Sequence, residues 1–116
     1  RSAVHELSLA EGGLDVLRDA ASKDGYARVT TVRLEIGRLS GVEVEAMRFC
    51  FDAVARGSIA EGARLEIDET PGSAWCLPCG RTVPIASRTD PCPACGSWQL
   101  QPNGGTRMSV REIEVE

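Results

Sequence analysis

Histidine, lysine and aromatic residues are scarce in this sequence. Its 116 residues include a single histidine, His5, a single lysine, Lys23, and two Trp, two Phe and one Tyr. Because aromatic rings are so few, a core must be built mainly from Leu, Val, Ile and Ala. Because His5 is the sole imidazole and no nucleophile is placed with a base, we do not expect an enzyme.

Long apolar runs and targeting signals are also missing. No run approaches the ~20 apolar residues that a membrane-spanning helix needs, so no membrane partner is expected. No basic segment followed by an apolar one marks a secretion signal, and we expect a cytoplasmic protein. With 42% hydrophobic and 26% charged residues, the chain has the composition of a globular protein and the length of one domain plus a small module.

Positive charge is thinly spread. The formal net charge is −4, from 13 basic and 17 acidic residues. Phosphate contacts need clustered lysines and arginines, and no such stripe is present. Nucleic acid is therefore not expected as a partner.

The pattern over residues 7–23 is helical. Apolar residues recur at steps of three and four, which places on one face Leu7, Ala10, Leu14, Leu17 and Ala21. Ser8 followed by Glu11 matches a capping box, although the helix can also begin earlier.

A second helix is predicted to follow Ser40, which forms another capping box with Glu43, and to end near Gly57. Its apolar face would contain Val44, Met47, Phe51 and Val54. Cys50 falls on the same face, so we interpret it as a buried, inert thiol.

Apolar and polar residues alternate, as expected of β-strands, in three segments: 29–36, 64–70 and 108–115. The apolar phase of the third shifts between Val110 and Ile113, which indicates a bulge or an end effect. A strand–helix–strand order permits a parallel pair with a right-handed crossover, so the sheet can be mixed. We predict an α+β fold in which two helices pack on this small three-stranded sheet.

Four cysteines stand in two matched pairs, Cys76-Leu-Pro-Cys79-Gly and Cys92-Pro-Ala-Cys95-Gly. Two intervening residues let both sulfurs of a pair face one ion, and each following Gly permits the positive φ of a tight turn. Two such knuckles complete a tetrahedral shell of four sulfurs, so Cys76, Cys79, Cys92 and Cys95 are the predicted zinc ligands.

Two disulfides or a redox CxxC pair are alternatives, but neither explains two matched knuckles. Iron also suits four sulfurs; we favour zinc because the module is appended to another domain and has few aromatic residues. With no open coordination position the ion would be structural, and it would supply folding energy to a segment too small for a substantial core. We expect a zinc ribbon at 73–105, inserted into a domain formed by 4–72 plus 106–116.

His5 and Glu6 are a second candidate metal site. We interpret Arg1 to Ala3 as an added extension and Val4 as a translated alternative start codon. In a chain that begins at Val4, the terminal amine, the amide nitrogen and the imidazole of His5 could chelate one Ni²⁺ or Cu²⁺, and Glu6 could add an oxygen. The extension displaces the amine, so we expect it to weaken nickel binding.

The opening Val4-His-Glu-Leu-Ser-Leu9, the stretch Val32-Arg-Leu-Glu-Ile-Gly-Arg-Leu-Ser40 and the paired knuckles resemble the HypA/HybF family of nickel metallochaperones. The resemblance covers nearly the whole chain. It implies that Ni²⁺ is a transferred cargo, delivered with a partner GTPase to the large subunit of NiFe hydrogenase and in some organisms to urease. Val4 departs from the Met of the family.

The resemblance also implies roles for individual residues. His5 would be the main nickel ligand, Glu6 an adjacent ligand or orienting group, and Glu43 a member of the nickel region. The four cysteines match the zinc ligands of the family. No histidine flanks them here, which argues against pH sensing at this site.

Two other functions compete with metal delivery. One is a zinc-ribbon adaptor for nucleic acid or the transcription machinery, which the acidic balance disfavours. The other is an electron carrier or thiol oxidoreductase that uses the CxxC pairs. The sequence leaves both monomer and dimer open.

Overall fold

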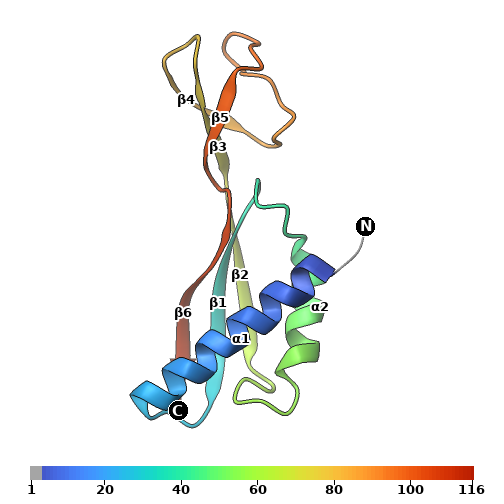
Figure 1. The fold of residues 1–116 in the computed structure, drawn as a ribbon, viewed down its shortest axis with the longest axis vertical. Coiled ribbons are helices and arrows are strands. Elements are labelled where there is room, and N and C mark those ends of the chain that lie inside the picture. The colour runs from blue at the N-terminus through green and yellow to red at the C-terminus, as the bar shows by residue number, and fades with distance from the viewer. Residues whose placement is uncertain (1–3) are drawn as a thin grey trace.

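The computed structural model describes residues 4–116, so the extension interpreted above, residues 1–3, lies outside the described part. The molecule is elongated, with extents of 52 × 30 × 18 Å. Figure 1 shows two helices and one sheet at one end and a second, smaller sheet projecting at the other. Within residues 4–116, neither helix combines the length and the apolar character that crossing a bilayer requires.

The larger sheet contains β1 (Val29–Gly37), β2 (Arg64–Thr70) and β6 (Met108–Val115) in the order β2-β1-β6. β1 pairs parallel with β2 and antiparallel with β6, so the mixed sheet is confirmed. The helices α1 (Val4–Asp24) and α2 (Val44–Ala55) pack with β1 in one apolar core, and α2 lies in the crossover between the parallel strands.

Alternation along β1 separates the two faces of the sheet, as predicted. Val32, Leu34 and Ile36 are buried in the core with the helices. Arg33 points the other way and forms ion pairs with three glutamates of the neighbouring strands, Glu66, Glu112 and Glu114. The uncovered face of the sheet is therefore charged.

The predicted bulge in the last strand is confirmed. Glu112 lies opposite Arg33 and Val110 lies opposite Leu34, which leaves Arg111 as an extra residue between two consecutive residues of β1. The bulge explains the shift of apolar phase in the sequence.

The start of the first helix differs from the prediction. α1 begins at Val4, so the capping box proposed at Ser8 is wrong and Ser8 lies inside the helix. Leu7 is 40% exposed, whereas Glu6 is only 1% exposed. The inward stripe runs through Glu6, Ala10, Leu14 and Leu17, since that spacing brings these positions to one side.

The start of the second helix also needs a correction. Glu43, not Ser40, is the N-cap residue of α2, and its carboxylate accepts hydrogen bonds from the amides of Glu45 (3.3 Å) and Ala46 (2.7 Å). The hydroxyl of Ser40 instead accepts from the Val42 amide in the preceding turn. The predicted apolar face of α2 is confirmed, because Met47 and Phe51 are buried, and Cys50 is buried beside them.

The smaller sheet contains β3 (Gly72–Cys76), β4 (Arg81–Ile85) and β5 (Leu100–Gly104) in the order β4-β3-β5. Its core is a separate cluster that includes Ala74, Val83 and Ile85 together with two of the cysteines. One member, Leu39, comes from the turn after β1 and is 3% exposed. The larger sheet therefore contributes a side chain to the core of the smaller one.

Two glycines, Gly37 and Gly105, lie at the junction of the two sheets. A Cβ on Gly37 would collide with the carbonyl of Gly105, and a Cβ on Gly105 would collide with the carbonyl of Pro71. The Gly105 carbonyl accepts from the Leu39 amide at 2.7 Å, which holds the turn after β1 against the connection from β5 to β6. Only glycine allows the backbones to approach this closely.

Candidate metal centres

The four paired cysteines lie together at the far end of the smaller sheet. Cys76 ends β3, Cys79 follows in the first knuckle, and Cys92 and Cys95 belong to the second knuckle. Their sulfur atoms all lie within 4.8 Å of one another. Within the described chain, this is the group of cysteine, histidine and acidic side chains that gathers closely enough to share an ion.

The sulfur spacing fits a tetrahedral ion. Zn–S bonds of ~2.3 Å in a tetrahedral shell place neighbouring sulfurs ~3.8 Å apart. The Cys76 and Cys95 sulfurs are 3.6 Å apart, and those of Cys79 and Cys92 are 3.9 Å apart. Both distances far exceed the ~2.05 Å of a disulfide bond, which disfavours the disulfide alternative.

Each knuckle is a tight turn closed by glycine, as predicted. The Gly80 amide donates to the Cys76 carbonyl at 2.9 Å, and the Gly96 amide donates to the Cys92 carbonyl at 2.8 Å. The φ angles of Gly80 and Gly96 are 64° and 76°, in the left-handed region that disfavours side chains. The turns direct both sulfurs of each pair inward.

The thiols strongly affect one another. Interactions with Cys95 and Cys76, together with burial, raise the pKa of Cys79 to about 12, and burial raises the pKa of Cys76. Burial also disfavours ionisation of Cys92, but the amides of Cys95 and Ala94 outweigh it and lower the pKa of Cys92 to about 6. Four sulfur ligands are crowded here, and a bound cation would favour and neutralise their thiolate forms.

The three residues assigned to nickel meet at another corner of the molecule, where α1 begins and α2 begins. The buried carboxylate of Glu6 accepts a hydrogen bond from the backbone amide of Glu43 at 2.9 Å. The imidazole of His5 is 55% exposed, and its Nδ1 lies 4.0 Å from Glu6 Oε2. The fold thus brings together two segments that are 37 positions apart in the sequence.

Both carboxylates at this corner already have structural roles. Glu6 fixes α1 to the start of α2, and Glu43 caps α2 with its own side chain. The first amides of a helix have no carbonyl partner in the helix, so the backbone nitrogens near His5 are not used by α1. Exposed imidazole, helix-start amides and an adjacent carboxylate therefore lie side by side.

The role of Glu6 as a link between the helices gives a testable prediction. Glu6→Ala should lower the free energy of unfolding by ~1–3 kcal/mol, because the Glu43 amide loses its acceptor in a partly buried hydrogen bond. Glu6→Gln keeps a side-chain oxygen and should lose much less. Denaturant unfolding measures both, with Glu11→Ala as a control because Glu11 is exposed on the same helix. Equal stability of Glu6→Ala and Glu11→Ala would exclude the link.

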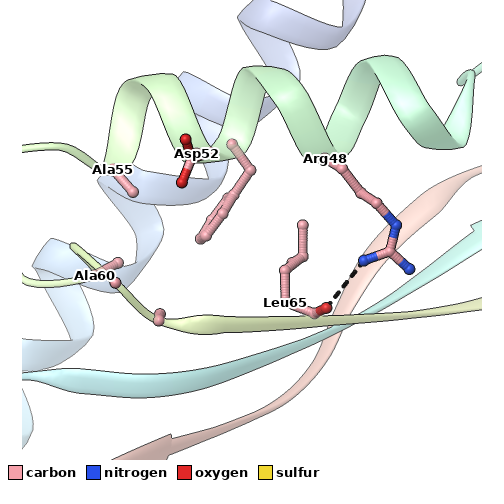
Figure 2. Close-up of a pocket in the computed structure, with 8 residues that line it drawn as sticks. Arg48, Asp52, Ala55, Ala60 and Leu65 are labelled. Carbon is pink, nitrogen blue, oxygen red and sulfur yellow. Dashed lines mark hydrogen bonds between the residues drawn. The ribbon is translucent and has the colours of Figure 1, made fainter.

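A cavity of about 210 Å³ lies elsewhere, between α2 and the start of β2. Figure 2 shows Arg48 above it, donating to the Leu65 carbonyl at 3.1 Å, and Asp52 at its rim. The lining is otherwise small or apolar and includes none of the predicted metal ligands. We assign it no chemistry.

Comparison with known proteins decides the family. The model of a family described as "Hydrogenase/urease nickel incorporation, metallochaperone, hypA" matches residues 4–115. The chain belongs to the HypA family. The predicted resemblance is confirmed.

Relatives within the HypA family are similar over their whole length. A hydrogenase maturation factor HypA from Albidiferax ferrireducens is 63% identical, with 97% of this chain and 100% of the relative covered. The HypA of Dechloromonas aromatica is 56% identical, again with 97% of this chain and 100% of the relative covered.

Solved HypA structures share the fold. The solution structure of the Ni metallochaperone HypA from Helicobacter pylori matches with a TM-score of 0.70 and 19% identity, covering 95% of this chain and 96% of that one. Another solution structure of a HypA protein gives a TM-score of 0.71 at 21% identity, covering 97% and 96%.

Proposed function

We propose that this member of the HypA family is a cytoplasmic, non-enzymatic carrier that binds Ni²⁺ as cargo at the corner of α1 and α2. His5 is the main ligand, Glu6 is an adjacent ligand or orienting group, and Glu43 completes the region. The observation that supports this best is the contact of buried Glu6 with the Glu43 amide beside an exposed imidazole, in a chain whose family is described by nickel incorporation.

The exposure of His5 suits a carrier. A resident metal is normally enclosed by its ligands, whereas cargo must enter and leave again. His5 is half exposed and lies in the first turn of α1, where an acceptor protein could reach it. We propose that a maturation GTPase and the large subunit of a hydrogenase receive the ion, with urease as a further destination.

We further propose that zinc is the resident ion of the four cysteines and that its role is structural. The sulfur spacing fits zinc, and four protein ligands leave no position for a substrate. On this reading residues 73–105 form the zinc ribbon, and residues 4–72 with 106–116 form the nickel domain. Leu39 packs across that boundary.

Nickel titration tests the proposal. In the zinc-loaded chain, His5→Ala should lower the affinity for Ni²⁺ at least ten-fold, or about 1.4 kcal/mol, because the one imidazole is lost. Isothermal titration measures the affinity, and zinc analysis of the same samples should show one zinc per chain throughout. Tight nickel binding by His5→Ala would reject the site.

Glu112→Gln is a matched control, because it removes an exposed carboxylate of the uncovered sheet face without altering the helix corner. It should bind nickel as the parent chain does. An equal loss in Glu112→Gln and His5→Ala would mean that net charge, rather than the corner of α1 and α2, governs binding.

A further inference from the structure

The first cysteine knuckle (residues 76–80) and the second (residues 92–96) match position by position. Each begins with a buried cysteine, Cys76 or Cys92, which are 0% and 2% exposed. Each ends at a glycine with a positive φ, Gly80 or Gly96, whose amide closes the turn on the carbonyl of that first cysteine. Because the two backbone turns agree, equivalent positions in the two knuckles can be compared directly.

The third position distinguishes the two knuckles. In the second knuckle this position is Ala94, whose backbone amide donates a hydrogen bond to the sulfur of Cys92 at 3.4 Å. In the first knuckle it is Pro78, and proline has no amide hydrogen to donate. The sulfur of Cys76 therefore cannot receive the hydrogen bond that the equivalent sulfur of Cys92 receives.

The fourth position does not make up the difference. The amide of Cys79 stabilises negative charge on the Cys76 sulfur, and the amide of Cys95 does the same for the Cys92 sulfur. The second knuckle adds the Ala94 amide to this shared contribution. The side chains at the third position are exposed in both knuckles, so the difference between them is one backbone donor and not packing.

A backbone donor beside a metal-binding sulfur affects how firmly the ion is held. Four thiolates carry more negative charge than one Zn²⁺ neutralises, and amide donors disperse the excess. Hydrogen bonds to charged groups are stronger than those between neutral groups. Loss of such an outer partner of a metal ligand typically lowers metal affinity roughly 10–100-fold.

We infer that Pro78 makes the first knuckle the weaker half of the zinc site, so that this knuckle releases the ion before the second one does. The inference rests on the proposed zinc and adds an order of release to it. All four cysteines remain ligands, and the backbone donor of Ala94 sets the order.

Exchange of the donor between the knuckles provides the test, with a chromophoric chelator competing for zinc against the zinc-loaded full chain. Pro78→Ala supplies the missing amide and should lower the dissociation constant for zinc about ten-fold. Ala94→Pro removes the amide from the second knuckle and should raise that constant about ten-fold. The two substitutions combined move the donor from one knuckle to the other and should restore the parental affinity.

Pro84→Ala is the matched control, because it removes an exposed proline ring from β4 and leaves both knuckles unchanged. It measures how far the greater flexibility of the unfolded chain alone alters zinc binding. Zinc binding by Pro78→Ala that is no tighter than that by Pro84→Ala would overturn the inference. A combined variant as weak as Ala94→Pro would also overturn it, because the two amides would not be equivalent.

Amide hydrogen exchange in the zinc-loaded parent chain measures the order of release directly. Gly80 and Gly96 are equivalent reporters, since each amide is bonded to the carbonyl of the first cysteine of its knuckle. After correction for intrinsic rates, Gly80 should exchange about ten-fold faster than Gly96, and Pro78→Ala should remove the difference. Exchange of Gly96 as fast as that of Gly80 in the parent would overturn the inference.

Zinc analysis of the same samples separates this inference from the proposed function. A parent chain that binds no zinc would reject the proposed zinc site itself. One zinc per chain, held with the same affinity by the parent, Pro78→Ala and Ala94→Pro, would leave that site in place and reject the order of release alone.

Discussion

Replacing Cys76 with Ser is expected to release the proposed zinc and to unfold the smaller sheet, while β1, β2 and β6 remain paired. The smaller sheet has six buried residues in its core cluster, and two of them are cysteines. So small a core cannot hold its own fold, and structural zinc sites supply ~10–16 kcal/mol of apparent binding free energy. Loss of one ligand removes most of that stabilisation.

Two measurements test the expected effect of Cys76→Ser. Metal analysis should show far less than one zinc per chain, and amide hydrogen exchange should lose protection across β3, β4 and β5 but retain it in β1. Cys50→Ala is the matched control, because Cys50 is a buried cysteine of α2 outside the cluster. It should keep full zinc and protection in the smaller sheet. A folded smaller sheet in metal-free Cys76→Ser would refute a structural role for the ion.

Local patterns were sufficient to predict both helices and the three strands of the larger sheet, but the strands β3, β4 and β5 of the smaller sheet were not predicted individually. The alternation of Val32, Leu34 and Ile36 predicts a strand with one buried face, and the phase shift before Ile113 predicts the bulge. The knuckle spacing predicts that four sulfurs converge, because CxxC turns act over a few residues only. Each strand pattern and each single CxxC pair is local in the sequence, where chain geometry is dictated by backbone sterics.

Cap positions were less predictable, since several polar residues compete for the same amides. Ser40 and Glu43 both suit a cap, and the turn after β1 binds Ser40 to Val42 instead. The contact of Glu6 with the Glu43 amide joins segments that are distant in the sequence. A glutamate within a helix is normally expected to be exposed to solvent, so the sequence did not predict this contact. The one indication that Glu6 would be buried was its position, four residues before the buried Ala10 on the same face of the helix.

Leu39 was also missed as a core residue. It lies in the short turn that follows Gly37, where the residues show no helical or strand periodicity. Its neighbours are Ala74, Val83 and Ile85, more than thirty positions away. The available indication that Leu39 is buried was that it is a lone apolar residue in a polar turn. Only the packing of the two sheets shows which residues cover it.

Leu39→Ala is expected to destabilise the smaller sheet by ~2–5 kcal/mol, the range for a buried leucine whose cavity cannot collapse. Leu39 is held from both sides of its backbone, because its amide donates to Gly105 and its carbonyl accepts from Arg88 at 2.9 Å. The backbone therefore cannot move inward to fill the space. Amide hydrogen exchange in β3 and β4 measures the loss.

The proposed zinc should remain bound in Leu39→Ala, since all four ligands are intact, so this variant separates packing from metal ligation. Leu77→Ala is its control: Leu77 lies in the first knuckle, next to Cys76, but is 53% exposed. An exposed leucine contributes little, so that change should stay within ~0.5 kcal/mol. Equal effects of the two substitutions would mean that the smaller sheet is held by its metal alone and that the contact from the turn after β1 contributes no stability.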